Sequence, residues 1–129
     1  MYLLMRTEQE EAYVALVKDY EHVAEKSWQA HRELSDTLLK TIEDLLTEQS
    51  ADWKDVDGIG IFKGPGSFTG LRVGATVANT LASSLSVNVV GVNGDNWQHE
   101  AIEKLDNKEN DRIVVPEYGG EANITKPRK

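Results

Sequence analysis

Short apolar runs separated by acidic residues open the chain, and this pattern predicts antiparallel strands. Residues 2–5 and 12–17 are β-prone, and the acidic stretch 8–11 between them suits a connection. A second turn at 18–21 leads into a mixed segment, 22–28. The first part of the chain is therefore predicted to form a three-stranded meander.

The next segment changes to a helical period. Its apolar residues recur at three- and four-residue steps: Leu34, Leu38, Ile42, Leu45 and Leu46. This spacing predicts a helix over residues 35–48, with Ser35 placed to cap the first turn. The polar stretch 50–57 then interrupts the pattern.

Two further strands flank a second helix. The apolar run 58–62 predicts a short buried strand, and the β-branched run 88–92 predicts the strand that returns from the helix. Apolar residues between them have helical spacing: Leu71, Val73, Val77, Ala78, Leu81 and Leu85. They predict a helix over residues 70–85.

The pattern weakens after Gly94. Asp95 is placed to cap a short helix, and four apolar residues would share one face of it: Trp97, Ala101, Ile102 and Leu105. Residues 106–111 are predicted to be a loop and 113–115 an edge strand. The expected organisation is one lobe over residues 1–115 and an exposed tail over 116–129.

The element order β-β-β-α-β-α-β, with a C-terminal helix, predicts an α/β fold on a mixed sheet of about five strands. A helix between two strands of one sheet requires a parallel crossover, whereas the opening meander is antiparallel. One lobe of the actin, sugar-kinase and Hsp70 class, with its ribonuclease H-like sheet, has this arrangement. Fold alone does not establish function.

Composition excludes several functional classes. The chain has 129 residues and a net charge of -8, which disfavours direct binding of nucleic acid and leaves contact with RNA to a partner. The absence of cysteine removes disulfides, thiolate zinc sites and thiol nucleophiles. No apolar run approaches the roughly 20 residues that span a bilayer, and no secretion signal opens the chain. These properties favour a cytoplasmic protein.

Other candidate chemistry is weak. His22, His31 and His99 have no paired spacing, so no metal site is expected. Ser67 does not stand in a G-x-S-x-G elbow, which gives a serine hydrolase or peptidase no support. The basic end, residues 126–129, is either a solubilising tail or a contact for RNA or an acidic partner.

The most specific motif is the glycine-rich run 64–74, which joins a predicted strand to a predicted helix. It matches neither the dinucleotide G-x-G-x-x-G fingerprint nor a P-loop. Its loop residues suit a tight turn that starts a helix: Gly64, Pro65, Gly66, Ser67 and Thr69. Either Ser67 or Thr69 is placed to cap that helix. Backbone N–H groups at such a junction can instead meet an anion or another protein.

Small residues at a spacing of four form a smooth strip on the second helix. Gly70, Gly74 and Ala78 would allow close approach by another backbone. Glycine inside a helix costs about 1 kcal/mol relative to alanine, so Gly74 implies a packing reason. The sheet beneath the helix is the favoured neighbour, and a partner helix is the alternative.

The run Gly-Pro-Gly-Ser-Phe-Thr-Gly-Leu-Arg-Val-Gly, together with the apolar strand 89–92, resembles the motif of the TsaB (YeaZ) family. The resemblance covers residues 34–92 and, more weakly, the opening strands. It implies a non-catalytic protein that pairs with the enzyme TsaD and the ATPase TsaE in threonylcarbamoyl modification of the tRNA adenosine beside the anticodon. It also implies that the helices 35–48 and 70–85 meet their counterparts in TsaD.

Two departures from the family pattern affect this expectation. The first strand ends in Met5-Arg6-Thr7, where the family usually has Ile-Asp-Thr, and an arginine at this point disfavours ATP hydrolysis. The chain also has room for little more than one of the family's two lobes. A single lobe should lack a closed nucleotide pocket, and either its C-terminal segment or a second copy would cover the uncovered face.

The expected protein is thus a TsaB-like accessory subunit without a cofactor, a metal or a catalytic residue. Nine residues are predicted to form its interface with a TsaD-like subunit: Leu38, Ile42, Leu45, Gly70, Arg72, Gly74, Val77, Ala78 and Leu81. Two alternatives stay open. The chain is a small nucleotide-binding protein that uses the loop 64–70, or it is a self-associating remnant that has lost its partner.

Overall fold

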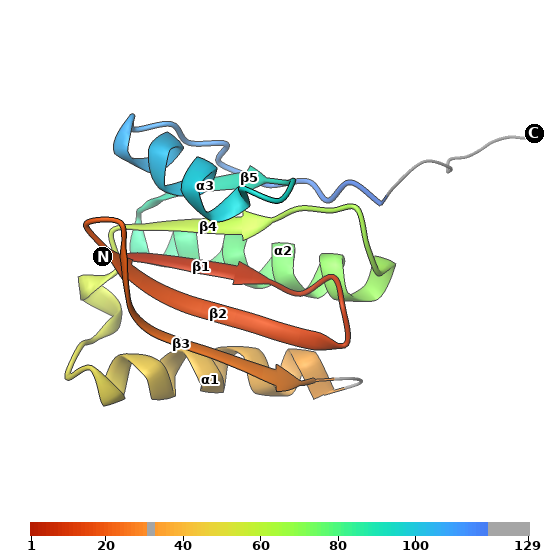
Figure 1. Cartoon of the computed structure of the whole chain (residues 1–129), viewed down its shortest axis with the longest axis horizontal. Helices are drawn as coiled ribbons and strands as arrows, with labels where there is room; N and C mark the ends of the chain where they lie inside the picture. Colours follow the sequence, from red (N-terminus) through yellow and green to blue (C-terminus); the bar gives the residue numbers. More distant parts are fainter. Residues whose placement is uncertain (31–32, 119–129) are drawn as a thin grey trace, which may run out of the picture.

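The computed structural model describes residues 1–30 and 33–118, which form a five-stranded sheet flanked by three α-helices (Figure 1). The strands are β1 (Tyr2–Arg6), β2 (Glu11–Lys18), β3 (Glu21–Gln29), β4 (Gly58–Phe62) and β5 (Asn88–Val92). The helices are α1 (Leu34–Glu48), α2 (Phe68–Leu85) and α3 (Trp97–Asp106), with a short 3-10 turn, η2 (Trp53–Asp55). The predicted order β-β-β-α-β-α-β and the C-terminal helix are confirmed.

The sheet is mixed, as its element order predicts. Its strands lie in the order β3-β2-β1-β4-β5. The pairs β1/β2 and β2/β3 are antiparallel, and the pairs β1/β4 and β4/β5 are parallel. The carboxyl ends of β1, β4 and β5 therefore meet at one edge of the sheet.

Side chains from alternate strand positions build two cores. Leu3 and Met5 face α1 and α2, whereas Leu4 faces α3 with Trp97 and Leu105. Figure 1 shows α2 and α3 on opposite sides of the sheet. The four apolar residues predicted to share a face of α3 are all buried, so the C-terminal helix covers the face that one lobe would otherwise leave open.

Close contact with the end of β1 fixes the position of α2. A Cβ added at Gly70 would lie 2.0 Å from the Thr7 carbonyl oxygen, and one at Gly74 would lie 2.1 Å from Thr7 Oγ1. The Thr7 hydroxyl, which is fully buried, donates a hydrogen bond of 2.8 Å to the Gly70 carbonyl. The small-residue strip of α2 therefore packs on the sheet, which was the favoured expectation.

The segment after α3 runs along the outer edge of β5, and we call residues 107–118 the C-terminal strap. Asp111 Oδ2 accepts the Gly91 N–H at 2.7 Å, and Asn110 Oδ1 accepts the Val89 N–H at 3.1 Å. Further along, the buried Val114 is held through both its backbone groups by the Asn79 side chain. Side chains and a few backbone bonds thus cover an edge that would otherwise be open to another strand.

Three local predictions are wrong. Residues 113–115 are not a strand, because the edge of β5 bonds to Asn110 and Asp111 before the chain reaches them. Ser35 does not cap α1, which begins one residue earlier with Glu33 at the N-cap and no side-chain cap. Asp95 does not cap α3, whose N-cap is Asn96, again without a side-chain bond. Of the tail predicted over 116–129, residues 116–118 belong to the strap, and residues 119–129 lie outside the described residues.

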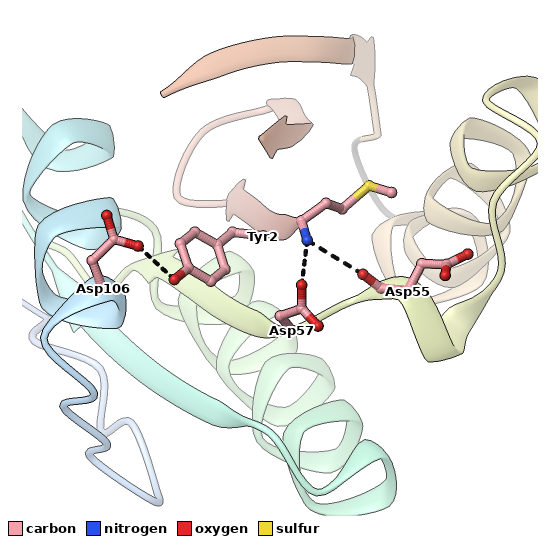
Figure 2. Close-up of polar contacts among 5 residues, drawn as sticks. Tyr2, Asp55, Asp57 and Asp106 are labelled. Atoms are coloured by element: carbon pink, nitrogen blue, oxygen red, sulfur yellow. Dashed lines mark hydrogen bonds and ion pairs between the residues drawn. The ribbon is translucent and has the colours of Figure 1, made fainter. Parts of the chain in front are cut away.

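Polar contacts tie the start of β1 to its neighbours (Figure 2). The Met1 amino group lies 2.5 Å from Asp57 Oδ2 and 3.4 Å from the Asp55 carbonyl oxygen. The Tyr2 hydroxyl donates a hydrogen bond of 2.6 Å to Asp106 at the end of α3. Burial, with a further contribution from Asp106, raises the pKa of Tyr2 to about 12 from 10.0.

Substitution of Gly74 by alanine is expected to destabilise the fold by roughly 1–2 kcal/mol. The gain in helix propensity is about 1 kcal/mol, but overpacking against Thr7 costs about 1–3 kcal/mol and displacing its hydroxyl loses a hydrogen bond. Urea denaturation measures the difference. Thr76→Ala, at an exposed position of the same helix, is the control and should lose no stability. Equal stability of the two variants would contradict the packing described above.

Alkaline pH is expected to weaken the fold through Tyr2. Because the pKa of Tyr2 is raised in the folded chain, its stabilising contribution is complete below pH 10 and is lost as the pH rises towards 12. Tyr2→Phe should be less stable than the wild type at pH 8, and the difference should shrink across this range. Denaturant titrations at several pH values test this, and a difference that stays constant would refute it.

Candidate protein interface

The loop of the glycine-rich motif starts α2 with a serine cap. Ser67 Oγ accepts the Gly70 N–H at 3.3 Å, and the Ser67 carbonyl oxygen accepts the Leu71 N–H at 2.9 Å. Of the two residues predicted as caps, Ser67 is therefore confirmed, and Thr69 instead lines a groove.

Glycines 64 and 66 let this loop pass close to other parts of the chain. Gly64 has φ +128°, and a Cβ there would lie 2.0 Å from the Glu117 carbonyl oxygen in the strap. A Cβ at Gly66 would lie 2.3 Å from Glu8 Cβ. Since Glu117 N–H also donates to the Lys63 carbonyl at 2.7 Å, the loop is held between the β1–β2 connection and the strap.

Most of the residues predicted for the interface lie inside the lobe. Six of the nine are buried against the sheet: Leu38, Ile42, Leu45, Gly70, Gly74 and Ala78. Val77 and Leu81 are half-buried at the edge of the same core, and Arg72 is exposed. The helical spacing of apolar residues identified the side of each helix that packs against the sheet. That side is already covered within this lobe. These six positions do not reach the surface of the folded chain.

A groove runs between α1 and the first half of α2. It consists of two adjoining hollows of about 570 Å³ and about 320 Å³, which share Ser35, Thr69 and Val73. The smaller hollow is completed by Arg72, Thr76 and Val77 of α2. Its lining combines valine methyl groups, hydroxyls and a single charged side chain, a composition typical of a protein contact surface.

Sequence reasoning missed two residues on the outer side of α2: Thr76, which lines the smaller hollow, and Phe68, which lies outside both hollows. Thr76 is exposed, and Phe68 has 55% of its surface exposed at the first position of α2. A search for apolar periodicity selects the buried stripe and passes over these residues. An aromatic residue between serine and threonine in a helix-starting loop was the available indication.

The carboxyl edge of the parallel strands is occupied by an ion pair. Arg6 at the end of β1 binds Glu8 through three contacts, two of them from Nε at 3.1 Å. The guanidinium carbon lies 4.2 Å from the centroid of Phe62 and 5.5 Å from that of Trp97. Glu8 is almost fully buried, with 4% of its side chain exposed, so its charge depends on Arg6.

Open α/β sheets usually bind ligands at this edge. A crevice of about 400 Å³ is present here, lined by Arg6, Glu8, Phe62, Gly66 and Asp95 among others. Both cations near it are paired, Arg6 with Glu8 and Lys63 with Glu117 at 3.3 Å. In residues 1–30 and 33–118, no three His, Cys, Asp or Glu side chains are grouped to hold a metal ion.

Helix length and hydropathy give one further result. Within the described part of the chain, no helix is long and apolar enough to cross a membrane.

Comparison with known proteins identifies the relatives of the chain. A family model for TsaD, tRNA N6-adenosine threonylcarbamoyltransferase, matches residues 26–116. The tRNA threonylcarbamoyladenosine biosynthesis protein TsaB of Haemophilus influenzae is 31% identical over 110 residues, which are 84% of this chain and 45% of that protein. A tRNA N6-adenosine threonylcarbamoyltransferase of Rippkaea orientalis is 37% identical over 79 residues, 61% of this chain and 22% of that one.

Solved structures agree with the sequence comparison. YeaZ from Pseudomonas aeruginosa superimposes with a TM-score of 0.65 and 32% identity, over 72% of this chain and 44% of that protein. This match confirms the predicted fold, a single lobe of the actin-like, ribonuclease H-like class. The chain spans less than half the length of the curated relatives it matches. With the TsaD family model covering most of its length and TsaB and YeaZ proteins about 30% identical to it, the chain belongs to the TsaB (YeaZ) family.

Proposed function

We propose that this chain is a non-catalytic, TsaB-like partner of a TsaD-like subunit in threonylcarbamoyl modification of tRNA. It docks through the groove between α1 and α2 and the adjoining outer face of α2, and it contacts tRNA only through its partner. The relatives named above support the pathway. The whole-protein role is inferred from them, because this chain covers less than half of their length.

The observation that carries the proposal is the low charge of the outer face of α2. The 18 residues of α2 include one charged side chain, Arg72, in a protein with 22 acidic and 14 basic residues. The neighbouring α1, with 15 residues, carries Asp36, Glu43, Asp44, Glu48 and Lys40. Burying hydroxyls and methyl groups costs far less than burying carboxylates, so α2 offers a face that a partner can cover.

A nucleotide-binding role has less support. A nucleotide phosphate and its magnesium ion would have to bind at the carboxyl edge, beside the Arg6–Glu8 pair. The Arg6 guanidinium is already bound to Glu8 there, and the buried Glu8 carboxylate requires that ion pair. Loop 64–70 is held against Glu8 and the strap, and Ser67 Oγ already accepts one of the first N–H groups of α2.

Docking is expected to produce a complex with the TsaD-like subunit of the same organism at micromolar concentration. Size-exclusion chromatography with light scattering measures it. Thr76→Asp adds a carboxylate to the groove, one turn from Arg72, that a covering partner would have to desolvate, and it should weaken binding by about 1–3 kcal/mol, which is roughly tenfold to a hundredfold in Kd. Asn96→Asp, at the N-cap of α3 across the sheet, adds the same charge outside the groove and should leave the Kd unchanged.

Three results would argue against this function. Separate elution of the two wild-type proteins would remove the docking proposal. Equal effects of Thr76→Asp and Asn96→Asp would move the interface away from the groove. A stable homodimer that ignores the TsaD-like subunit would favour a self-associating remnant.

ATP with magnesium is expected to give no binding heat in isothermal titration. The Arg6–Glu8 pair would have to separate first, and that would leave a buried carboxylate without its partner. A saturable heat with a Kd below roughly 1 mM would reinstate the nucleotide-binding alternative.

A further inference from the structure

Arg72 stands alone on the outer face of α2. It is exposed, and within the described ranges it has no carboxylate partner, although Arg6 and Lys63 both have one. It contacts an aromatic ring, since its guanidinium carbon lies 5.5 Å from the centroid of Phe68 one turn earlier. The charge of Arg72 is therefore available to another molecule.

The ring of Phe68 that contacts Arg72 also packs against a second aromatic ring, that of Tyr118. Phe68 and Tyr118 lie with their centroids 4.5 Å apart and their planes inclined by 34°. They are nevertheless 55% and 40% exposed, so together they present apolar surface to solvent. Phe68 is the first residue of α2, and Tyr118 is at the end of the strap, so two distant segments build one cluster.

The strap gives this cluster a firm base. Glu117, next to Tyr118, makes three contacts: its N–H with the Lys63 carbonyl, its carboxylate with Lys63 at 3.3 Å, and its carboxylate with Asn93 at 2.7 Å. The ring of Tyr118 is thereby positioned against Phe68 before any partner binds. Aromatic and arginine side chains that are held in this way are the residues that most often dominate binding energy in protein interfaces.

We propose that Phe68, Arg72 and Tyr118 form an anchor that receives a carboxylate on an otherwise apolar surface of the partner. Charge complementarity indicates that the group bound at this anchor is a carboxylate. The chain carries a net charge of -8, so acidic groups on a partner are repelled over most of its surface, and Arg72 is the cation that α2 offers them. A carboxylate bound at this point fixes the position of the partner along α2. The groove beside it contributes contact area between the two proteins.

This inference rests on the proposed docking function. It identifies Arg72 as the residue that selects the partner. Arginine suits the task better than lysine, because its planar fork binds a carboxylate through two hydrogen bonds while its face remains stacked on a ring. Once a partner covers the cluster, its aromatic rings exclude water from the ion pair, which strengthens that pair.

The test measures the Kd of the complex with the TsaD-like subunit for the wild type, three variants of Arg72 and one of Phe68, at low and high salt. We expect a small loss for Arg72→Lys, about tenfold for Arg72→Ala, and about a hundredfold for Arg72→Glu. Raising sodium chloride from roughly 0.05 to 0.5 M should weaken the wild-type complex more than the Arg72→Ala complex. Phe68→Ala should weaken binding without loss of fold, since the ring is largely exposed.

Lys54→Glu provides the matched control, because it makes the same change in charge at an exposed residue of η2. Binding by the wild type with equal Kd values for Arg72→Glu and Lys54→Glu would overturn this inference and leave docking intact. The same conclusion would follow if salt affected the wild type and Arg72→Ala equally. Failure of the wild type to bind at all would overturn the proposed function itself.

Discussion

The contact between α2 and the end of β1 is the constraint on which the rest of the lobe depends. Thr7 is fully buried, its carbonyl oxygen lies where a Cβ of Gly70 would be, and its hydroxyl binds the Gly70 carbonyl. No side chain larger than hydrogen fits at Gly70 or Gly74 without displacing Thr7. This contact sets the height of α2 above the sheet and its rotation. The rotation in turn decides that Arg72 and Thr76 point outward.

How far the sequence predicts this structure depends on the kind of force involved. Periodic burial is repeated over many residues, so it predicted all five strands and three helices. A hydrogen bond made by a single side chain, such as a helix cap, leaves no repeated pattern in the sequence. The caps expected from Ser35 and Asp95 fail because neighbouring residues start those helices, whereas Ser67 caps α2 as predicted. Six of the nine residues predicted for the interface are buried for a related reason, since apolar spacing marks the residues that the sheet covers.

The strap could not have been predicted from local pattern. Residues 113–115 have the composition of a strand, yet only Val114 is buried, and the edge of β5 bonds to the side chains of Asn110 and Asp111. These contacts join residues about twenty positions apart through side-chain oxygens that replace strand carbonyls. Because Glu117 then binds Lys63 and Asn93, the same segment brings Tyr118 to Phe68. The strap thus protects a sheet edge and also completes the aromatic cluster.

Arg6, at the end of β1, and Arg72, on the outer face of α2, have opposite surroundings, and that difference indicates where a carboxylate from outside can bind. Arg6 is stacked on Phe62 and bound to the buried Glu8, so a ligand at the carboxyl edge would have to compete with an internal ion pair. Arg72 is stacked on Phe68 but has no carboxylate among residues 1–30 and 33–118. Arg6 is already partly buried and paired within the fold, whereas the guanidinium of Arg72 is still free to bind a carboxylate. An external carboxylate therefore gains most by binding on the outer face of α2, where it meets an unpaired guanidinium on a helix that carries no other charged side chain.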